Sequence, residues 1–157
     1  HQVAIGSEEI QDAPFYVKRR HQDGSSMFPM PEEQIRRRDK VQVRTLDTLF
    51  PDKLPGNVLL WLDCENSELN ALHGGIKFIE CVDMVNVELT ARTSGAAWVP
   101  PQVIYRWLRD RGFYMLWVHT MRIPDGQYDA IFVRQNIFKP ECCCIPSEIE
   151  RFFNATP

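Results

Sequence analysis

Residues 57–63, Asn-Val-Leu-Leu-Trp-Leu-Asp, restrict the fold of this 157-residue chain more than any other stretch. Their apolar side chains fall on both faces of a strand, which is typical of a parallel sheet covered by helices. Leucine and isoleucine then recur at helical spacing over 69–79, and residues 84–90 have the pattern of a second strand. Strand, helix and strand over about thirty residues predict a βαβ unit with a right-handed crossover.

The pattern after this unit predicts one more helix and a hairpin. Pro100 and Pro101 begin the helix, because a missing N–H costs little in the first helical turn, and Gly112 ends it. Strands at 113–120 and 128–134, joined by a turn, form the hairpin. The predicted fold class is therefore α/β, with a mostly parallel sheet and an antiparallel C-terminal hairpin.

The N-terminal part of the sequence has a weaker pattern. Residues 20–40 are polar, contain glycine and prolines, and are interpreted mostly as loop, whereas 40–46 alternate as a strand with one solvated face. A hydrophobic content of 44% is enough for a core. We predict a single domain over 1–157, made of strand and loop segments at 1–45, a βαβ core with its hairpin at 46–134, and a tail at 135–157.

Charge and hydropathy exclude several partners. The formal net charge of −3 does not suggest a nucleic-acid binder. The basic runs at 18–20 and 36–38 are interpreted as solvated loop charge in preference to a phosphate contact. No apolar run approaches the ~20 residues that a membrane span needs, so no membrane partner is predicted.

The five cysteines, at 64, 81 and 142–144, also restrict the function. An odd count with three adjacent residues is a poor disulfide framework, so the sequence predicts a reducing, cytoplasmic compartment. Adjacent cysteines point apart and lack the spacing of zinc ligands, so no metal site is predicted.

Acidic residues lie where predicted strands end. Asp63 and Glu65 follow the first strand of the βαβ unit, and Glu88 lies near the end of the second, at the sheet rim where α/β folds bind ligands. A carboxylate there is suited to accept a proton, bind sugar hydroxyls or hold a divalent cation, and spacing alone does not choose among these. Glu68 lies in the first turn of the next helix, where we favour a stabilising interaction with the helix dipole.

Other candidates have a structural interpretation. His73 is predicted on an exposed helix face, and His119 ends a strand, where a hydrogen-bonded structural role is favoured over catalysis. Trp98 and Tyr105 are interpreted equally as pocket lining or core. Motifs of serine hydrolases, P-loop proteins, zinc proteases and dinucleotide-binding folds do not occur in the sequence.

The stretches VQVRTLDTLF and LLWLDCENSELNALHGG resemble the second half of FkbM-type S-adenosylmethionine-dependent methyltransferases. In that family a TLD segment precedes a strand ending in D-x-E-G-x-E and an L-x-G helix. Asn66 replaces the usual glycine, which predicts a differently shaped turn. The matching residues here are Thr45, Leu46 and Asp47, then Asp63, Glu65 and Glu68, then Leu72 and Gly74, and finally Glu88.

The resemblance implies a partial Rossmann-like methyltransferase sheet and methyl transfer from S-adenosylmethionine to a sugar or natural-product hydroxyl. It implies catalytic roles for Asp63 and Glu65. VAIGS and DGSSMF resemble the family's adenine-side strand end and its small-polar loop. The implied cofactor-binding residues are Ala4 and Ile5, and the implied substrate-binding residues are Glu88, Ser26 and Glu68.

The family's glycine-rich cofactor loop and ribose-binding acid have no counterpart in these residues. We therefore expect this chain to lack the cofactor-binding first half and to bind the cofactor weakly by itself. The strand at 57–63 would then be an exposed sheet edge, and we expect either self-association of the chain through this edge or its covering by residues 1–40. The alternatives are a non-catalytic interaction module with a methyltransferase-like half-fold and, less favoured, a metal-dependent hydrolase.

Overall fold

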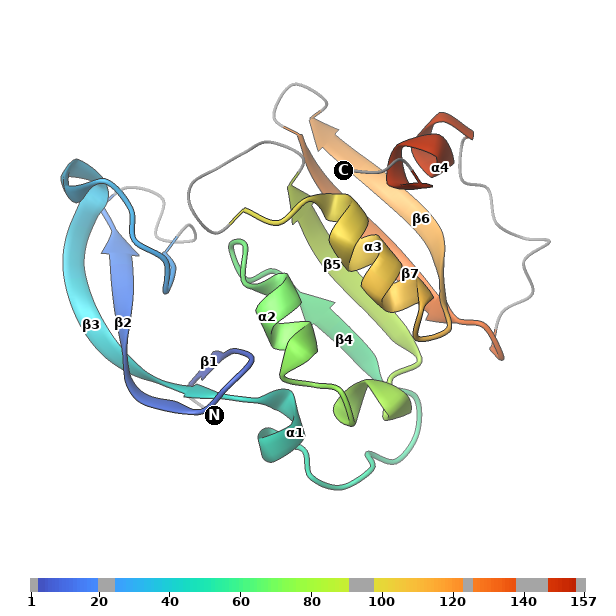
Figure 1. Ribbon diagram of the computed structural model, residues 1–157, viewed down its shortest axis with the longest axis horizontal. Coiled ribbons are helices and arrows are strands. Elements are labelled where there is room, and N and C mark those ends of the chain that lie inside the picture. The colour runs from blue at the N-terminus through green and yellow to red at the C-terminus, as the bar shows by residue number, and fades with distance from the viewer. Residues whose placement is uncertain (1–2, 20–24, 91–97, 123–125, 138–146, 155–157) are drawn as a thin grey trace. The chain divides into compact units, whose positions relative to one another are not determined.

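The computed structural model describes residues 3–19, 25–90, 98–122, 126–137 and 147–154 (Figure 1). The chain divides into two compact units, each described here by itself. The first consists of His1–Lys53, Cys64–Glu80 and Ser94–Ala97, and the second of Leu54–Asp63, Cys81–Thr93 and Trp98–Pro157.

The first unit contains a three-stranded sheet in the order β1-β3-β2. Strand β1 (Ala4–Ile5) is parallel to β3 (Ile35–Arg44), and β2 (Ile10–Lys18) is antiparallel to β3. Pro14 lies within β2, which is tolerated because β2 is an edge strand of this sheet. The helical elements that lie wholly within the same unit are η2 (Glu32–Gln34), α1 (Leu46–Leu49) and α2 (Glu68–His73); η3 (Phe78–Cys81) begins in this unit and ends in the second.

The second unit contains a four-stranded sheet in the order β4-β5-β7-β6. Strand β4 (Leu59–Leu62) is parallel to β5 (Met84–Thr90), as the sequence predicts for 57–63 and 84–90. The predicted hairpin is present as β6 (Phe113–Arg122) and β7 (Gln127–Arg134), and β7 is also antiparallel to β5.

The prediction of a mostly parallel, Rossmann-like sheet is wrong. The described strands form two mixed sheets in which antiparallel pairing predominates, because β2–β3, β5–β7 and β6–β7 are all antiparallel. Residues 35–39 of β3 lie in the segment interpreted as loop, and the antiparallel pairing of β2 with β3 was not predicted. Strand β3 carries Arg36, Arg37 and Arg38, and such charges conceal the alternation by which a strand is recognised.

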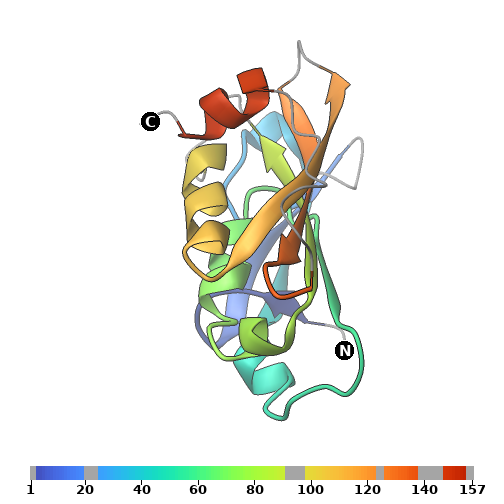
Figure 2. The same ribbon diagram turned by 90° about the vertical axis from the view of Figure 1, so that its right-hand side faces the viewer.

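Helix α3 (Pro101–Arg109) confirms the helix predicted after Pro100, and Gly112 beyond its end has a φ of 81°. Tyr105 of α3 packs against Phe132 of β7 and against Phe153 of α4 (Ser147–Asn154), with ring centroids 6.2 and 5.3 Å apart. Both helices therefore cover the same face of this sheet, as the side view in Figure 2 shows. Buried side chains of that face include Val85, Val87, Leu89, Ala130 and Phe132.

No helix in the described ranges is long and apolar enough to cross a membrane.

Candidate functional site

The segment after β4 is a tight turn in the first unit, from Cys64 to Ser67. The Ser67 N–H donates to the Cys64 carbonyl oxygen at 3.1 Å, and the two central residues, Glu65 and Asn66, have φ values of 50° and 73°. Positive φ at both central positions is the signature of a type I′ turn. Asparagine tolerates this conformation, which is how the chain makes the turn without the family's glycine. Glu65 is held in a conformation that costs a non-glycine residue ~1–2 kcal/mol.

Glu68 stabilises this turn. Its Oε1 accepts a hydrogen bond from the Cys64 N–H at 2.8 Å, and the residue is buried, with 5% of its surface exposed. A buried carboxylate bound to a backbone amide at the start of α2 supports the structural interpretation that the sequence favoured for Glu68.

Ser26 lies beside the same turn. Its hydroxyl donates to the Glu65 carbonyl oxygen over 3.5 Å and accepts from the Phe28 N–H at 3.3 Å. The Ser26 backbone forms two hydrogen bonds with Tyr16, of 2.8 and 3.1 Å. The predicted site residues Ser26, Glu65 and Glu68 are therefore brought together in the first unit.

Two further residues of the TLD and L-x-G segments have structural contacts. The Asp47 carboxylate accepts from the N–H groups of Lys77 and Phe78, the latter at 2.7 Å. A Cβ atom on Gly74 would lie 2.0 Å from the Gly6 carbonyl oxygen, so only glycine fits there. These two positions maintain the fold of the first unit.

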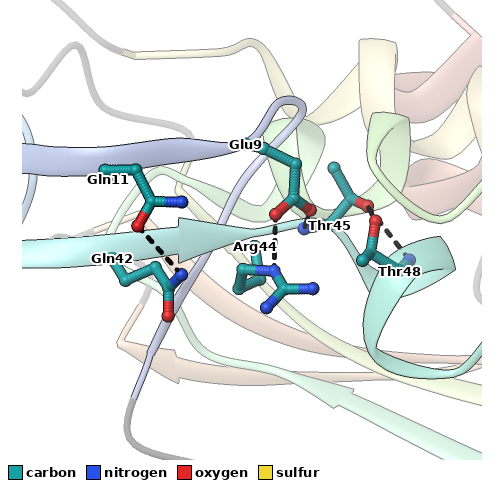
Figure 3. Close-up of polar contacts among 6 residues, drawn as sticks. All are labelled: Glu9, Gln11, Gln42, Arg44, Thr45 and Thr48. Atoms are coloured by element: carbon teal, nitrogen blue, oxygen red, sulfur yellow. Dashed lines mark hydrogen bonds and ion pairs between the residues drawn. The ribbon is translucent and has the colours of Figure 1, made fainter.

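The carboxylate of Glu9 ties the start of β2 to the end of β3 (Figure 3). It accepts from the Thr45 N–H at 2.8 Å and forms an ion pair with Arg44. The hydrogen bond from Thr45 is the main reason why the pKa of Glu9 lies below its ordinary value. Thr45 in turn caps α1, because its hydroxyl accepts from the Thr48 N–H at 3.1 Å.

The predicted cofactor-binding residues, Ala4 and Ile5, form β1 and are half-buried. A pocket of about 200 Å³ lies in the same unit. Ligand pockets usually have ~300–1,000 Å³, so this one is too small to enclose a whole S-adenosylmethionine molecule. This pocket alone therefore does not enclose the complete cofactor. The lining consists of Gly6, Ser7, Glu8, Ile10, Ala13, Pro14, Met27, Phe28, Val43 and Asn70.

Asp63 and Glu88 belong to the second unit. Asp63 directly follows β4, is exposed, and has no hydrogen bond or ion pair with a described residue. Glu88 of β5 lies opposite Asp129 of β7, and Asp129 lies opposite His119 of β6. Side chains directly opposite one another share a face, with Cβ atoms ~4.5–5.5 Å apart. The sheet thus places two carboxylates and an imidazole in one row.

Sequence reasoning missed Asp129 and interpreted His119 as structural. The missing information was the register of the hairpin against β5, which pairs Glu88 with Asp129. The His119 ring also stacks on Trp117, with centroids 5.2 Å apart and planes 9° from parallel. His73 is exposed, as predicted.

The remaining predictions concern two aromatic residues, the cysteine cluster and a metal site. Tyr105, which is half-buried, packs against Phe132, and the Trp98 Nε1–H donates to the Thr90 carbonyl oxygen at 2.8 Å. The cysteine cluster at 142–144 lies outside the described residues. Within the described residues, no group of three or more histidine, cysteine or acidic side chains is arranged to hold a metal ion.

Comparison with known proteins defines the class of this chain. The family model described as the methyltransferase FkbM domain matches residues 1–115, which include the TLD segment, the turn acids and Glu88. The chain belongs to the FkbM methyltransferase-domain family, and the resemblance seen in the sequence is confirmed. No curated protein and no solved structure matches the sequence.

Proposed function

We propose that this protein functions as an S-adenosylmethionine-dependent O-methyltransferase that acts on a hydroxyl group of a sugar or another natural product. Membership of the methyltransferase family supports the reaction class. The observation that carries the proposal is Glu65, which is held at a φ of 50° in the turn directly after Asp63. Strained backbone of this kind persists where the surrounding structure fixes it, and it is concentrated at functional sites.

When bound, S-adenosylmethionine supplies the methyl group. The protein's own tasks are to position the acceptor hydroxyl, to accept its proton and to exclude water. Asp63 is suited to act as the proton acceptor, because its side chain is exposed and forms no hydrogen bond or ion pair with a described residue. Glu65 and Ser26, which lie together in the first unit, are proposed to bind acceptor hydroxyls, whereas Glu68 positions the turn through its bond to Cys64. A hydroxyl-binding role is proposed separately for Glu88 of the second unit.

The test of this proposal is methyl transfer to a panel of sugar and polyol acceptors by the protein as its gene encodes it. Asp63→Asn keeps the shape of the side chain and removes its charge. We expect activity to fall ~10²–10⁴-fold, as is usual on loss of a general base. Asp52→Asn, at another exposed aspartate, is the matched control and should retain full activity. Activity of Asp63→Asn within about threefold of the parent, with the fold intact, would show that Asp63 is not the proton acceptor.

A specific observation favours a second candidate, a non-catalytic interaction module. Leu59, Trp61 and Trp117 are large apolar side chains that are 54%, 67% and 47% exposed. Exposed apolar groups of this size often mark contact sites for other molecules. Lack of methyl transfer to every acceptor, together with retained binding of a partner, would favour this candidate.

The five cysteines without a disulfide pattern support a cytoplasmic location as a further part of the proposal.

A further inference from the structure

The basic residues at 18 and 36–38, which the sequence assigned to loops, lie in the paired strands β2 and β3 (Figure 1). Tyr16 of β2 lies directly opposite Arg38 of β3, so their side chains share one face of the sheet. Lys40 follows Arg38 by two residues and shares that face, because side chains alternate along a strand. Lys18 follows Tyr16 by two residues and shares it too, since the register shift there adds its extra residue to β3.

Lys18, Arg38 and Lys40 form a basic face that is open to solvent. Lys40 is exposed, Lys18 is half-buried, and the Arg38 side chain is 51% exposed. Lys18 and Lys40 form no ion pair with a described residue. Arg38 pairs with Glu32, whose side chain is 77% exposed. An exposed ion pair of this kind is weak, so an acidic ligand can displace Glu32 from Arg38.

The opposite face of the same strands packs in the core of the first unit. Ala13 and Val17 of β2 belong to that face and are only 5% and 7% exposed. Ammonium and guanidinium groups without a partner are costly to bury, so the basic face remains in contact with water or with an anion. It is therefore a surface for a charged ligand and not part of an apolar interface.

The basic face adjoins the candidate site of the same unit. Ser26 pairs with Tyr16 on the side of β2 that faces away from β3, through backbone hydrogen bonds of 2.8 and 3.1 Å. The Ser26 hydroxyl in turn donates to the Glu65 carbonyl oxygen. Ser26 and Arg38 therefore lie on either side of Tyr16, two strand spacings or ~10 Å apart. The Arg38 guanidinium extends over the Tyr16 ring, 6.0 Å from its centre, so one small ligand can reach both sides.

We infer that the methyl acceptor is an acidic sugar, whose phosphate, sulfate or carboxylate group binds the basic face while its hydroxyl groups lie at Ser26 and Glu65. This inference rests on the proposed function and adds the charge of the acceptor to it. Arginine presents paired N–H donors that match two oxygens of such an acid, and lysine adds a compact positive charge. The acid takes the place of Glu32 at Arg38.

A nucleic acid is a less suitable ligand for this face. Tyr16 is the one aromatic side chain on this face of the described β2–β3 pair, and Arg38 lies over its ring. Sites for single-stranded nucleic acids usually offer several aromatic rings on which successive bases stack. The net charge of −3 also opposes a long polyanion, whereas a short acidic sugar meets only the local positive charge.

Isothermal titration calorimetry at low ionic strength, where charges are least screened, tests the inference on the protein as its gene encodes it. Tetragalacturonate, sulfated maltotetraose and phosphorylated maltotetraose carry the three acids, and neutral maltotetraose is the control ligand. A single-stranded oligonucleotide of similar charge represents nucleic acids. At least one acidic sugar should bind more tightly than both neutral maltotetraose and the oligonucleotide, and the tightest of the three identifies the acid.

The double variant Arg38→Gln, Lys40→Gln should bind that acidic sugar about tenfold more weakly or worse, because it loses charged hydrogen bonds. Arg37→Gln, Lys53→Gln is the matched control with the same change of net charge. Arg37 lies on the opposite face and pairs with Asp39 at 2.8 Å, and Lys53 lies outside both strands. This control should bind as the wild type does. Circular dichroism must show the same folded spectrum for both double variants.

Three results would overturn the inference: equal binding of acidic and neutral sugars, tighter binding of the oligonucleotide, or equal losses in the two double variants. In methyl transfer, Arg38→Gln, Lys40→Gln should raise the KM for the acidic acceptor and leave kcat unchanged. Binding is measured without methyl transfer, so the two proposals fail separately. A protein that binds acidic sugars but methylates none contradicts the proposed function, whereas one that methylates neutral sugars and does not prefer acidic ones contradicts this inference alone.

Discussion

At the scale of single residues, Glu9 couples the stability of the first unit to pH. Its carboxylate accepts from the Thr45 N–H and pairs with Arg44, and the pKa of Glu9 is lowered in the folded chain. A lower pKa in the folded state means that the folded structure stabilises the charged carboxylate of Glu9 relative to its protonated form. The resulting stability is fully present above the ordinary glutamate pKa of 4.5 and is lost as the pH falls through the folded value.

We predict that Glu9→Gln lowers the free energy of unfolding at neutral pH and that its difference from the wild type disappears in acid. Urea unfolding at about pH 7 and about pH 3 measures both quantities. Glu8→Gln, at an exposed neighbour with no hydrogen bond or ion pair to a described residue, is the control and should match the wild type at both pH values. An equal effect of Glu9→Gln at both pH values would contradict the ionic role.

At the scale of elements, the turn from Cys64 to Ser67 joins β4 to α2 and depends on left-handed backbone at two successive residues. Asn66 is suited to that conformation, whereas alanine is not. We predict that Asn66→Ala lowers the free energy of unfolding by ~1 kcal/mol, and that Asn66→Gly leaves it unchanged or raises it slightly. Urea unfolding of the two variants measures the difference. Equal stability of the alanine and glycine variants would show that the positive φ is not retained in solution.

At the scale of the whole molecule, the 157 residues contain no glycine-rich cofactor loop, and the pocket beside β1 holds about 200 Å³. We predict that this chain by itself does not bind S-adenosylmethionine tightly. Isothermal titration calorimetry should give no saturable heat at micromolar concentrations. A micromolar dissociation constant would mean that other residues of the chain complete a cofactor site. The matched control is S-adenosylhomocysteine, which has the same adenine and ribose groups. Its titration should also give no saturable heat.

Much of the second unit is predictable from local patterns. The strands at 57–63 and 84–90, the helix after Pro100 and the closing hairpin all have a hydrophobic period long enough to recognise. Residues 40–44 of β3 were predicted as strand, but the rest of β3 and its pairing with β2 were missed, because Pro14 and the arginine run conceal the alternation. The row that joins Glu88, Asp129 and His119 was also missed, because strand register is a non-local property.

The sequence by itself determined the family, the acids that follow β4 and the asparagine that permits their left-handed turn, because these are matters of residue identity and local spacing. Only the tertiary structure decided that the sheets are mixed and mostly antiparallel, that Glu88 faces Asp129, and that the outward side of β4 lacks a strand partner among the described residues. The physical reason is that a hydrophobic period specifies which face of a strand is buried. Which strand lies beside it, in what direction and register, depends on side-chain contacts between distant segments.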